Sequence, residues 1–349
     1  MKGRIVLLDH VRGRPAAALM VEGRLEDLLV DPADDSLLPG AICRALPDRP
    51  VKGLGGMFVK LPGGAQGFLR QTDGVAPGRA LVVQVTGPAE PGKALPVTTR
   101  LLFKGRLAIV TPGAPGLNIS RRVRDEGLRN ELQALAEAGM AGADRTHGLI
   151  LRSAAAFTDP GDVAEDIAAM RGLAAAVVAD LTGGPELLVE GAGAHETAWR
   201  DWADPAPDAV EEGTFEAHDI PARIDEGLAP RVALPGGAHM WVEPTKARVA
   251  VDVNTGPDTS PAAGLKASVA AARDLPRQLR LRGLGGQVAV DFAPVPKKER
   301  AVLDQVLRAA FKADGSEATA LGFGPLGLYE LTRRRDRLPL AAVLAGGAE

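Results

Sequence analysis

The sequence predicts a multidomain chain of mixed α/β and α+β class, and three features support this prediction. The length of 349 residues is enough for two or more domains. From about residue 50 to residue 99, short β-type runs alternate with Gly and Pro. From 240 to 348, strand-like and helix-like segments alternate instead. Such a change of pattern indicates neighbouring domains of different architecture.

The amino-terminal part reads as strands followed by a small barrel. Its strand-like segments lie at residues 4–9, 16–21 and 25–30. Val21-Glu22-Gly23-Arg24 is a hairpin turn signal, and we expect residues 31–45 to be a linker. Short β runs at the spacing of an OB-type barrel then follow at residues 56–61, 65–70, 80–85 and 94–100.

Two phenylalanines stand out in this expected barrel, because the whole chain is only 3% aromatic. Phe58 and Phe68 lie an even number of residues apart, so strand alternation would place both rings on one face. From spacing alone, packing in the core explains these rings more simply than a binding surface does.

The middle and the carboxyl-terminal part read as alternating helices and strands. We expect helices at residues 120–138, 160–180 and 296–314. We expect strands at residues 101–110, 148–155, 240–242, 248–253, 287–292 and 318–323. Residues 181–230 are rich in Pro, Gly and Ala, and we expect a connection with one or two short elements there.

Composition excludes several classes of protein. Cys43 is the single cysteine, so an internal disulfide and a cysteine-cluster metal site are ruled out. No apolar run approaches the ~20 residues that a membrane span needs. Residues 1–6 read as a strand and lack the pattern of a signal peptide. We therefore expect no membrane span and a location in the reducing cytoplasm.

Charge is nearly balanced overall but unevenly distributed along the chain. Residues 181–230 contain 12 Asp and Glu against 2 Arg. Residues 266–337 contain 14 Lys and Arg against 8 Asp and Glu. Two interpretations stay open: these segments form ordinary solvated faces, or the carboxyl-terminal part meets a polyanion.

The most informative motif is a strand–helix–strand unit in which each strand closes on an aspartate. Asp252 ends the first strand-like run and Asp291 ends the second. Neighbouring strands would bring both carboxylates to the same end of the sheet, where two hard oxygen ligands suit Mg²⁺. The arginines between residues 277 and 286 would suit a phosphate-bearing substrate beside them. Taken alone, Asp252 is explained more simply as a turn cap before Asn254.

Several motifs of this region together resemble the catalytic region of the ribonuclease E/G family. They occur in the family's order, at Ala250-Val251-Asp252-Val253-Asn254-Thr255-Gly256, Arg277 to Gly286, Val290-Asp291-Phe292 and Leu326 to Arg333. Weaker similarity touches most of residues 1–340, at Phe58-Val59, Gly67 to Leu69, Lys93, Ile119 to Arg122, Gly148 to Ala154 and Val232 to Gly237.

This resemblance implies a Mg²⁺-dependent endoribonuclease that cleaves single-stranded RNA in RNA processing or decay. It implies that Asp252 and Asp291 hold one Mg²⁺ and that Asn254 orients one of these carboxylates. A metal there would lower the pKa of a water molecule and offset charge as the phosphodiester is attacked.

The same resemblance implies RNA contacts in two other domains. Arg152 and Ser153 match the 5′-sensor residues that grip a terminal monophosphate, and Ser keeps the hydroxyl donor. Phe58 and Phe68 match base-stacking aromatic residues, and Lys93 matches a phosphate contact. With the resemblance added, stacking becomes the preferred interpretation of the two rings.

The implied architecture has four parts. An RNase H-like scaffold would cover residues 1–40 and 185–238, and a DNase I-like catalytic domain would cover residues 239–349. An OB-fold RNA-binding domain at residues 41–100 and a 5′-sensor-like domain at residues 101–184 would be inserted into the scaffold.

The sequence also departs from the family pattern. The Cys-rich zinc-link is absent, which predicts a monomer or a dimer unlike that of the family. Ala293-Pro294 stands where an acid is usual, and Pro276 should kink or end the helix between the two aspartates. These departures motivate an alternative function, a catalytically weak or inactive RNA-binding regulator. A phosphoester enzyme acting on small molecules is a third hypothesis.

Overall fold

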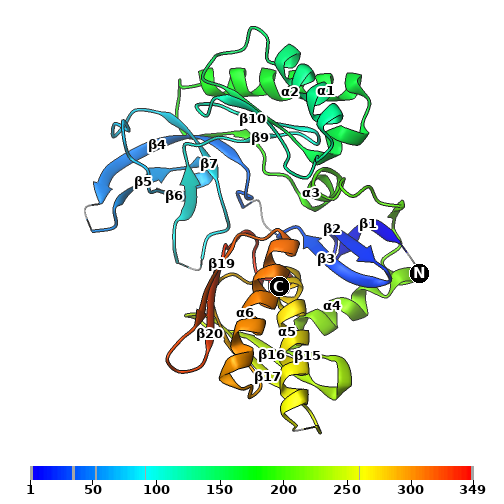
Figure 1. Cartoon of the computed structure of the whole chain (residues 1–349). Helices are drawn as coiled ribbons and strands as arrows, with labels where there is room; N and C mark the ends of the chain where they lie inside the picture. Colours follow the sequence, from blue (N-terminus) through cyan, green and yellow to red (C-terminus); the bar gives the residue numbers. More distant parts are fainter. Residues whose placement is uncertain (1–2, 34–35, 52, 91, 259, 347–349) are drawn as a thin grey trace. The chain divides into compact units, whose positions relative to one another are not determined.

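The computed structural model in Figure 1 describes residues 3–33, 36–51, 53–90, 92–258 and 260–346. The chain divides into two compact units. Apart from the gaps just given, the first unit holds residues 7–33 and 211–346, and the second unit holds residues 3–6 and 36–210. Among the described residues, no helix combines the length and the apolar character that crossing a bilayer requires.

A closed barrel of five strands lies in the second unit. Its strands are β4 (Ile42–Val51), β5 (Gly56–Lys60), β6 (Gln66–Leu69), β7 (Leu81–Val85) and β8 (Leu95–Thr98). They pair in the order β4-β5-β6-β8-β7, and β4 also pairs with β7, which closes the barrel. Buried aliphatic residues fill the interior. This confirms the predicted barrel, which is consistent with an OB-like fold.

The expected linker at residues 31–45 was wrong at its carboxyl end, because β4 begins at Ile42. Pro47 and Pro50 in this strand look like breaks in the sequence. The structure accommodates them where the register between β4 and β5 shifts, since a proline without an N–H fits best at such an irregularity. A fifth barrel strand was therefore missed.

The rest of the second unit is a four-stranded sheet with helices. The sheet order is β11 (Gly116–Ile119), β12 (Gly148–Leu151), β10 (Ala108–Thr111) and β9 (Phe103–Lys104). Helices α1 (Glu126–Gly139) and α2 (Pro160–Ala179) pack with this sheet around one core. The predicted helix at 160–180 is confirmed, whereas α1 starts six residues later than predicted. Its start is set by Asp125, which accepts a hydrogen bond from the Leu128 amide at 2.8 Å.

Residues 181–230 hold more structure than the one or two elements expected. They contain β13 (Glu186–Val189), α3 (Ala194–Asp201), β14 (Ala209–Glu212) and α4 (Ile220–Leu228). Strand β13 adds to the outside of β4 and starts at Glu186, whose carboxylate pairs with the buried Arg44. The acidic residues that suggested a loop are thus partly used as ion-pair partners.

The amino-terminal strands were predicted correctly. A four-stranded sheet has the order β14, β1 (Arg4–Val11), β2 (Arg14–Val21) and β3 (Arg24–Val30). The boundary between the two units passes through β1 and β14. Glu22 and Gly23 join β2 to β3 with φ angles of 50° and 77°, as a tight hairpin turn of the primed type requires.

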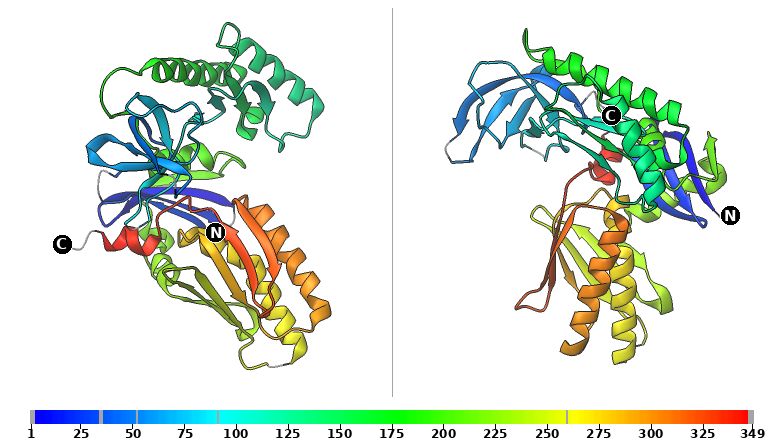
Figure 2. Two further views of the ribbon diagram at one scale, coloured as in Figure 1. Left: turned by 90° about the vertical axis from the view of Figure 1, so that its left-hand side faces the viewer. Right: turned by 45° about the horizontal axis from the view of Figure 1, so that its top comes forward.

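The first unit is built around a six-stranded sheet. Its order is β15 (Arg231–Ala233), β16 (His239–Pro244), β17 (Val249–Asn254), β18 (Gly286–Asp291), β20 (Tyr329–Arg333) and β19 (Ala318–Phe323). Only β17 and β18 are parallel neighbours, and helix α5 (Pro261–Leu281) connects them. Figure 2 shows α5 and α6 (Arg300–Asp314) side by side against the sheet. Their apolar residues share one core with alternate residues of the strands, so the opposite face is open.

We predicted that Pro276 would kink or end the helix between the aspartates. The helix does not end there, so that part of the prediction was wrong. Helix α5 continues through Pro276 to Leu281. Leu275 and Leu279 lie on either side of the proline and are buried in the core of the first unit. Their burial offsets the hydrogen bond that proline cannot donate, so packing outweighs local propensity here.

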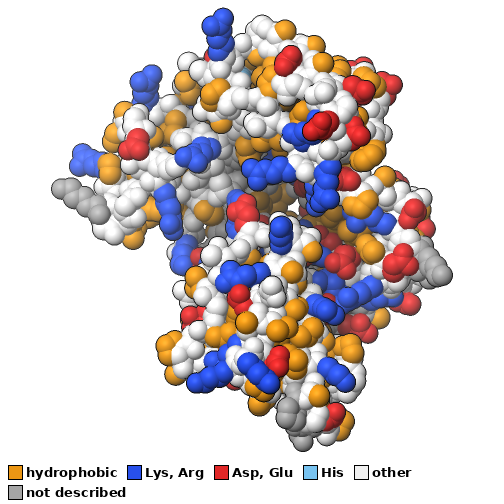
Figure 3. Space-filling model, viewed as in Figure 1, with side chains coloured by type: hydrophobic (Ala, Val, Ile, Leu, Met, Phe, Trp, Pro, Cys, Tyr) orange, Lys and Arg blue, Asp and Glu red, His pale blue; other side chains and the backbone are white. Residues whose placement is uncertain are grey.

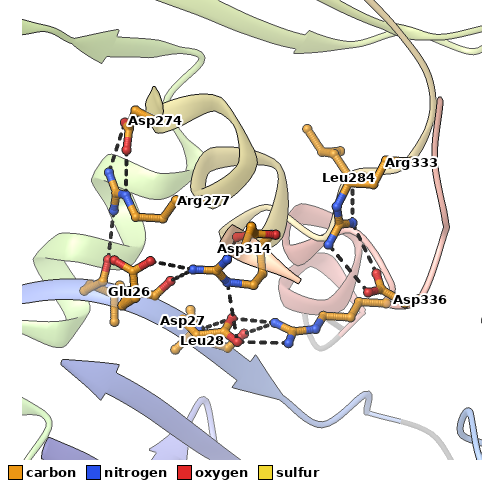
Figure 4. Close-up of polar contacts among 12 residues, drawn as sticks. Glu26, Asp27, Leu28, Asp274, Arg277, Leu284, Asp314, Arg333 and Asp336 are labelled. Atoms are coloured by element: carbon orange, nitrogen blue, oxygen red, sulfur yellow. Dashed lines mark hydrogen bonds and ion pairs between the residues drawn. The ribbon is translucent and has the colours of Figure 1, made fainter. Parts of the chain in front are cut away.

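A buried ionic network fastens α5 to strand β3 (Figure 4). Arg280 pairs with Glu26 at 2.7 Å, with Asp27 at 3.6 Å and with Asp314. Arg337 adds a second pair to Asp27, with Nη1 2.5 Å from Oδ1. Burial alone would raise the pKa of Asp27, but Arg337 and Arg280 outweigh burial and lower it below the usual 3.8. Asp27 is therefore ionised at neutral pH.

We expect Arg280→Met to lower the free energy of unfolding by about 3–5 kcal/mol, because it leaves buried carboxylates without their shared partner. Urea unfolding at pH 7 measures this loss. Since the folded-state pKa of Asp27 is lowered, its stabilising effect is complete above about pH 3.8. The effect disappears as the pH falls through the folded-state pKa, so the difference between variant and wild type should shrink there.

The pair between the exposed Arg308 and the half-buried Asp304 supplies the control for this prediction, because Asp304 keeps its hydrogen bond from Tyr329 when Arg308 is replaced. Arg308→Met should change the free energy of unfolding by no more than about 0.5 kcal/mol, as is usual for a surface i, i+4 pair. Equal losses in the two variants would contradict a special role for the buried network.

Candidate functional site

Asp252 and Asp291 lie directly opposite each other on the parallel strands β17 and β18. Both side chains are exposed, whereas Val251 and Val290 point to the other face and are buried. Neighbouring strands lie ~4.8 Å apart, so residues in register share one face at short range. The structure thus brings together the two carboxylates that the sequence singled out.

Asn254 holds one of these carboxylates in place. Its Nδ2 atom donates a hydrogen bond of 2.6 Å to Oδ2 of Asp252. Both residues belong to β17 and are two positions apart, so they point to the same face. This bond restricts rotation of the Asp252 side chain and leaves Oδ1 for another partner.

The turn after β17 depends on a close approach of two backbones. Gly256 has a φ of +76°, and a Cβ atom there would lie 2.4 Å from the carbonyl oxygen of Gly237. Only glycine combines this backbone conformation with that packing distance. The contact fixes the chain just beyond Asp252 and Asn254 against the segment that enters β16.

The two aspartates fit a cation that needs few protein ligands. Among the described residues, no group of three or more His, Cys, Asp or Glu side chains is placed to hold a metal ion. Mg²⁺ commonly uses only one or two carboxylates and keeps several waters. Two exposed carboxylates in register, one of them oriented by Asn254, are compatible with that donor set.

The arginines between residues 277 and 286 do not lie beside the aspartates, so that expectation was wrong. They belong to the carboxyl end of α5, which leads into the start of β18, whereas Asp291 is at the end of β18. Arg277 donates to the carbonyl oxygen of Leu25 at 2.8 Å, and Arg282 to that of Ala229 at 2.9 Å. These cations stabilise the fold of the first unit.

Other basic residues follow the aspartate end of the sheet. Lys297 and Lys298 are exposed in a short 3-10 turn, Lys297–Glu299, shortly after Asp291. Figure 3 shows Lys and Arg side chains interspersed with Asp and Glu over one face of the molecule. Part of the excess of basic residues at 266–337 is used in internal ion pairs, those of Arg277, Arg280 and Arg337 among them. Sequence reasoning missed these two lysines. Their position shortly after the strand that ends in Asp291 could have identified them.

Phe58 and Phe68 share one face of the barrel, as their spacing predicted. They are directly opposite each other on β5 and β6, with ring centroids 5.4 Å apart in an edge-to-face arrangement. Both rings are half-buried. Lys93 is exposed ahead of β8 and pairs with Glu90 at 2.9 Å.

Arg152 and Ser153 already have acidic partners within the second unit. Arg152 Nη2 lies 2.8 Å from Asp201, and its Nη1 donates to the carbonyl oxygen of Gly105 at 3.1 Å. Ser153 donates to Asp204. Burial would raise the pKa of Asp201, but hydrogen bonds and charge from Arg200, and after it from Arg152, outweigh burial and lower the pKa. A carboxylate thus stands where an anionic ligand of these residues would bind.

Comparison with known proteins finds one matching family and several similar sequences. The model of the Ribonuclease E/G family matches residues 103–212 and 206–336. Ribonuclease E of Nostoc sp. is 27% identical over 92% of this chain and 54% of its own length. Ribonuclease G of Salmonella typhimurium is 27% identical over 77% of this chain and 62% of its own length. The chloroplastic Ribonuclease E/G-like protein of Arabidopsis thaliana is 34% identical over 35% of this chain and 13% of its own length.

The chain belongs to the Ribonuclease E/G family. The resemblance inferred from the aspartate motifs is therefore confirmed. The chain spans only 54% of the length of the Nostoc protein and 62% of the length of the Salmonella protein.

The close approach at Gly256 gives a prediction with an internal control. Gly236 has a similar φ of +75°, but a Cβ atom there would meet nothing within 4 Å. An alanine in this conformation costs roughly 1–2 kcal/mol at either position. Gly256→Ala should cost clearly more than Gly236→Ala, because the Gly237 backbone must also move. Urea unfolding of both variants checks this, and equal losses would show that the packing contact is unimportant.

Proposed function

We propose that this chain is a Mg²⁺-dependent endoribonuclease that cleaves single-stranded RNA in RNA processing or decay. The observation that carries the proposal is the register of Asp252 with Asp291 on the open face of a sheet. Membership of the Ribonuclease E/G family supports the class of reaction and of substrate. The single buried cysteine fits the cytoplasmic location that we propose with it.

In this proposal each residue of the site has a distinct role. Asp252 and Asp291 hold the cation, and Asn254 keeps Asp252 in the orientation that coordination needs. When bound, Mg²⁺ supplies a water molecule of lowered pKa and offsets the charge that develops on the attacked phosphodiester. Lys297 and Lys298 add positive charge near the carboxyl end of β18, which favours an approaching phosphate backbone.

We propose that the chain is organised into the four domains that the family resemblance implies. The six-stranded sheet that carries the aspartates would be the DNase I-like catalytic domain, residues 239–349, and the amino-terminal sheet would belong to the RNase H-like scaffold, residues 1–40 and 185–238. The closed barrel supports an OB-fold domain at residues 41–100, and the sheet with α1 and α2 supports a sensor-like domain at residues 101–184.

The barrel is the proposed surface for RNA bases. Phe58 and Phe68 are half-buried and lie on one face, so each keeps part of a ring available for stacking. Base–aromatic stacking tolerates any sequence, since every base has a π-face. Lys93 is 66% exposed at its side chain and can exchange its pairing with Glu90 for a phosphate.

Arg152 and Ser153 are the proposed contacts of a 5′-phosphate, with Asp201 and Asp204 as competitors for them. A terminal phosphate would have to displace both carboxylates from their donors. The gain from each new charged hydrogen bond would then be offset by the loss of an existing one. We therefore propose that cleavage does not depend on a 5′-monophosphate.

Loss of either metal-binding carboxylate should abolish cleavage. We expect Asp252→Asn and Asp291→Asn each to slow cleavage of labelled single-stranded RNA at least a hundredfold, because the cation is worth several kcal/mol of transition-state stabilisation. EDTA should have the same effect on wild type. Asp258→Asn, an exposed carboxylate in the following loop, is the matched control and should cleave normally.

Two results would contradict this proposal. Unchanged cleavage in both aspartate variants would place the reaction elsewhere or assign it to a contaminant. RNA binding without cleavage by the wild type in Mg²⁺ would indicate the RNA-binding regulator instead.

The acidic competitors lead to a prediction about the 5′ end. Wild type should cleave RNA with a 5′-hydroxyl and RNA with a 5′-monophosphate at equal rates. A double variant, Asp201→Asn with Asp204→Asn, should prefer the monophosphate by roughly tenfold or more, because one charged hydrogen bond is worth about 1.5–3 kcal/mol. Adding Arg152→Gln should remove that preference. A strong monophosphate preference in wild type would show that the carboxylates do not compete.

A further inference from the structure

One row of side chains runs across four strands of the sheet that carries the aspartates. Arg231 on β15 is in register with Trp241 on β16, and Trp241 is in register with Asp252 on β17. Asp252 is in turn opposite Asp291 on β18. Since residues in register point to one face, a cation, an aromatic ring and the two carboxylates lie in line.

Trp241 lies on the open face of the sheet and not in its core. Met240 and Val242 on either side of it are buried among the core residues, and strand alternation turns Trp241 the other way. Its ring is half-buried and makes a T-shaped contact with the ring of His239, with centroids 6.4 Å apart. His239 therefore supports one side of the indole and helps to fix its orientation.

Small side chains lie beside the aspartates on the face of the sheet that carries Trp241. Alanines stand two positions before each aspartate, at residues 250 and 289, and these two alanines are also in register. Ala250 is exposed and Ala289 is half-exposed, so these two positions carry only methyl groups, and their outer neighbours in register are Glu243 and Glu330. Arg231 is exposed at the other end of the row.

We propose that Trp241 is a stacking platform for a nucleobase of the RNA next to the cleaved phosphodiester, with Arg231 contacting the adjoining phosphate. This inference rests on the proposed nuclease function and deepens it. Trp241 is one strand from Asp252 and Arg231 is two strands away, which places them ~5 Å and roughly 10 Å from the aspartate. In that order, an RNA chain that leads away from the two aspartates would place a base on Trp241 and the next phosphate at Arg231.

The chemistry of the row favours RNA over an apolar partner. An indole face binds any base by stacking, and a guanidinium binds a phosphate by charge-assisted hydrogen bonds. The nearest positions on its face along β16 and β17 are His239, Glu243 and Asp252, so the neighbours of the indole in these two strands are polar. An apolar protein surface would need a larger contiguous apolar area.

The test is equilibrium binding of fluorescent single-stranded RNA to Asp291→Asn protein, which leaves the Trp241–Asp252 pair intact and prevents cleavage. Trp241→Leu keeps apolar bulk but removes the π-face, and it should weaken binding roughly 5- to 150-fold. Trp241→Phe should restore most of the affinity. Arg231→Gln should lower the slope of log affinity against log salt by about 0.7.

A scan with single abasic nucleotides separates stacking from a structural role. One abasic position should weaken binding to the Asp291→Asn parent and have no further effect in Trp241→Leu. Leu321→Ala removes an exposed apolar residue from β19 of the same sheet and should bind like the parent. The proposal would be overturned if Trp241→Leu and the parent bound RNA with equal affinity. It would also be overturned if the abasic position reduced the affinity of both proteins equally.

Photocrosslinking keeps the proposal testable if the tryptophan variants do not fold. RNA carrying 5-iodouridine should crosslink to the peptide containing Trp241 in the unaltered chain, and absence of this crosslink would overturn the proposal. The two hypotheses can fail separately. Binding that depends on Trp241 without any cleavage would refute the nuclease alone, and cleavage that is insensitive to Trp241→Leu would refute the platform alone.

Discussion

The parallel pairing of β17 with β18 is the constraint on which the rest of the site depends. It brings Asp252 and Asp291 opposite each other although 38 positions separate them in the chain, and helix α5 makes the connection. A slip of one residue would turn one carboxylate into the core. The core prevents this, because Val251 and Val290 must face α5 and α6 to be buried. Burial of apolar side chains on one face thus fixes the geometry of the polar groups on the other.

The position of α5 is in turn held by charge. Arg280 and Arg337 meet Asp27 on β3, and Arg280 also reaches Asp314 at the end of α6. A buried network of this kind adds little stability over an apolar core, but it defines one arrangement, since any displacement leaves a charge unpaired. We interpret the arginines of α5 as the reason why the helix keeps its place along β3. Their charge therefore serves the geometry of the sheet.

Local patterns predicted much of the fold, and the errors have physical causes. The barrel strands and the two phenylalanines followed from alternation and turn residues, whereas β4 was missed because Pro47 and Pro50 hide a strand that bends at them. The arginines after Pro276 were assigned to the site because they lie between the two aspartates in the sequence. In a parallel strand–helix–strand unit, however, the carboxyl end of the helix leads to the start of the second strand, away from the end that carries Asp291. Trp241 was missed because its role depends on which residues lie beside it in the sheet. Its neighbours, Arg231 and Asp252, lie on other strands, and the sequence does not show how those strands pair.

Direct binding of a divalent cation tests the central claim most directly. Mn²⁺ accepts the same oxygen ligands as Mg²⁺ and is detected by electron paramagnetic resonance, without reference to cleavage. We predict one bound Mn²⁺ per wild-type chain, lost in Asp252→Asn and in Asp291→Asn and weakened in Asn254→Ala. Equal Mn²⁺ binding by wild type and by both aspartate variants would contradict the assignment of the two carboxylates as the metal site.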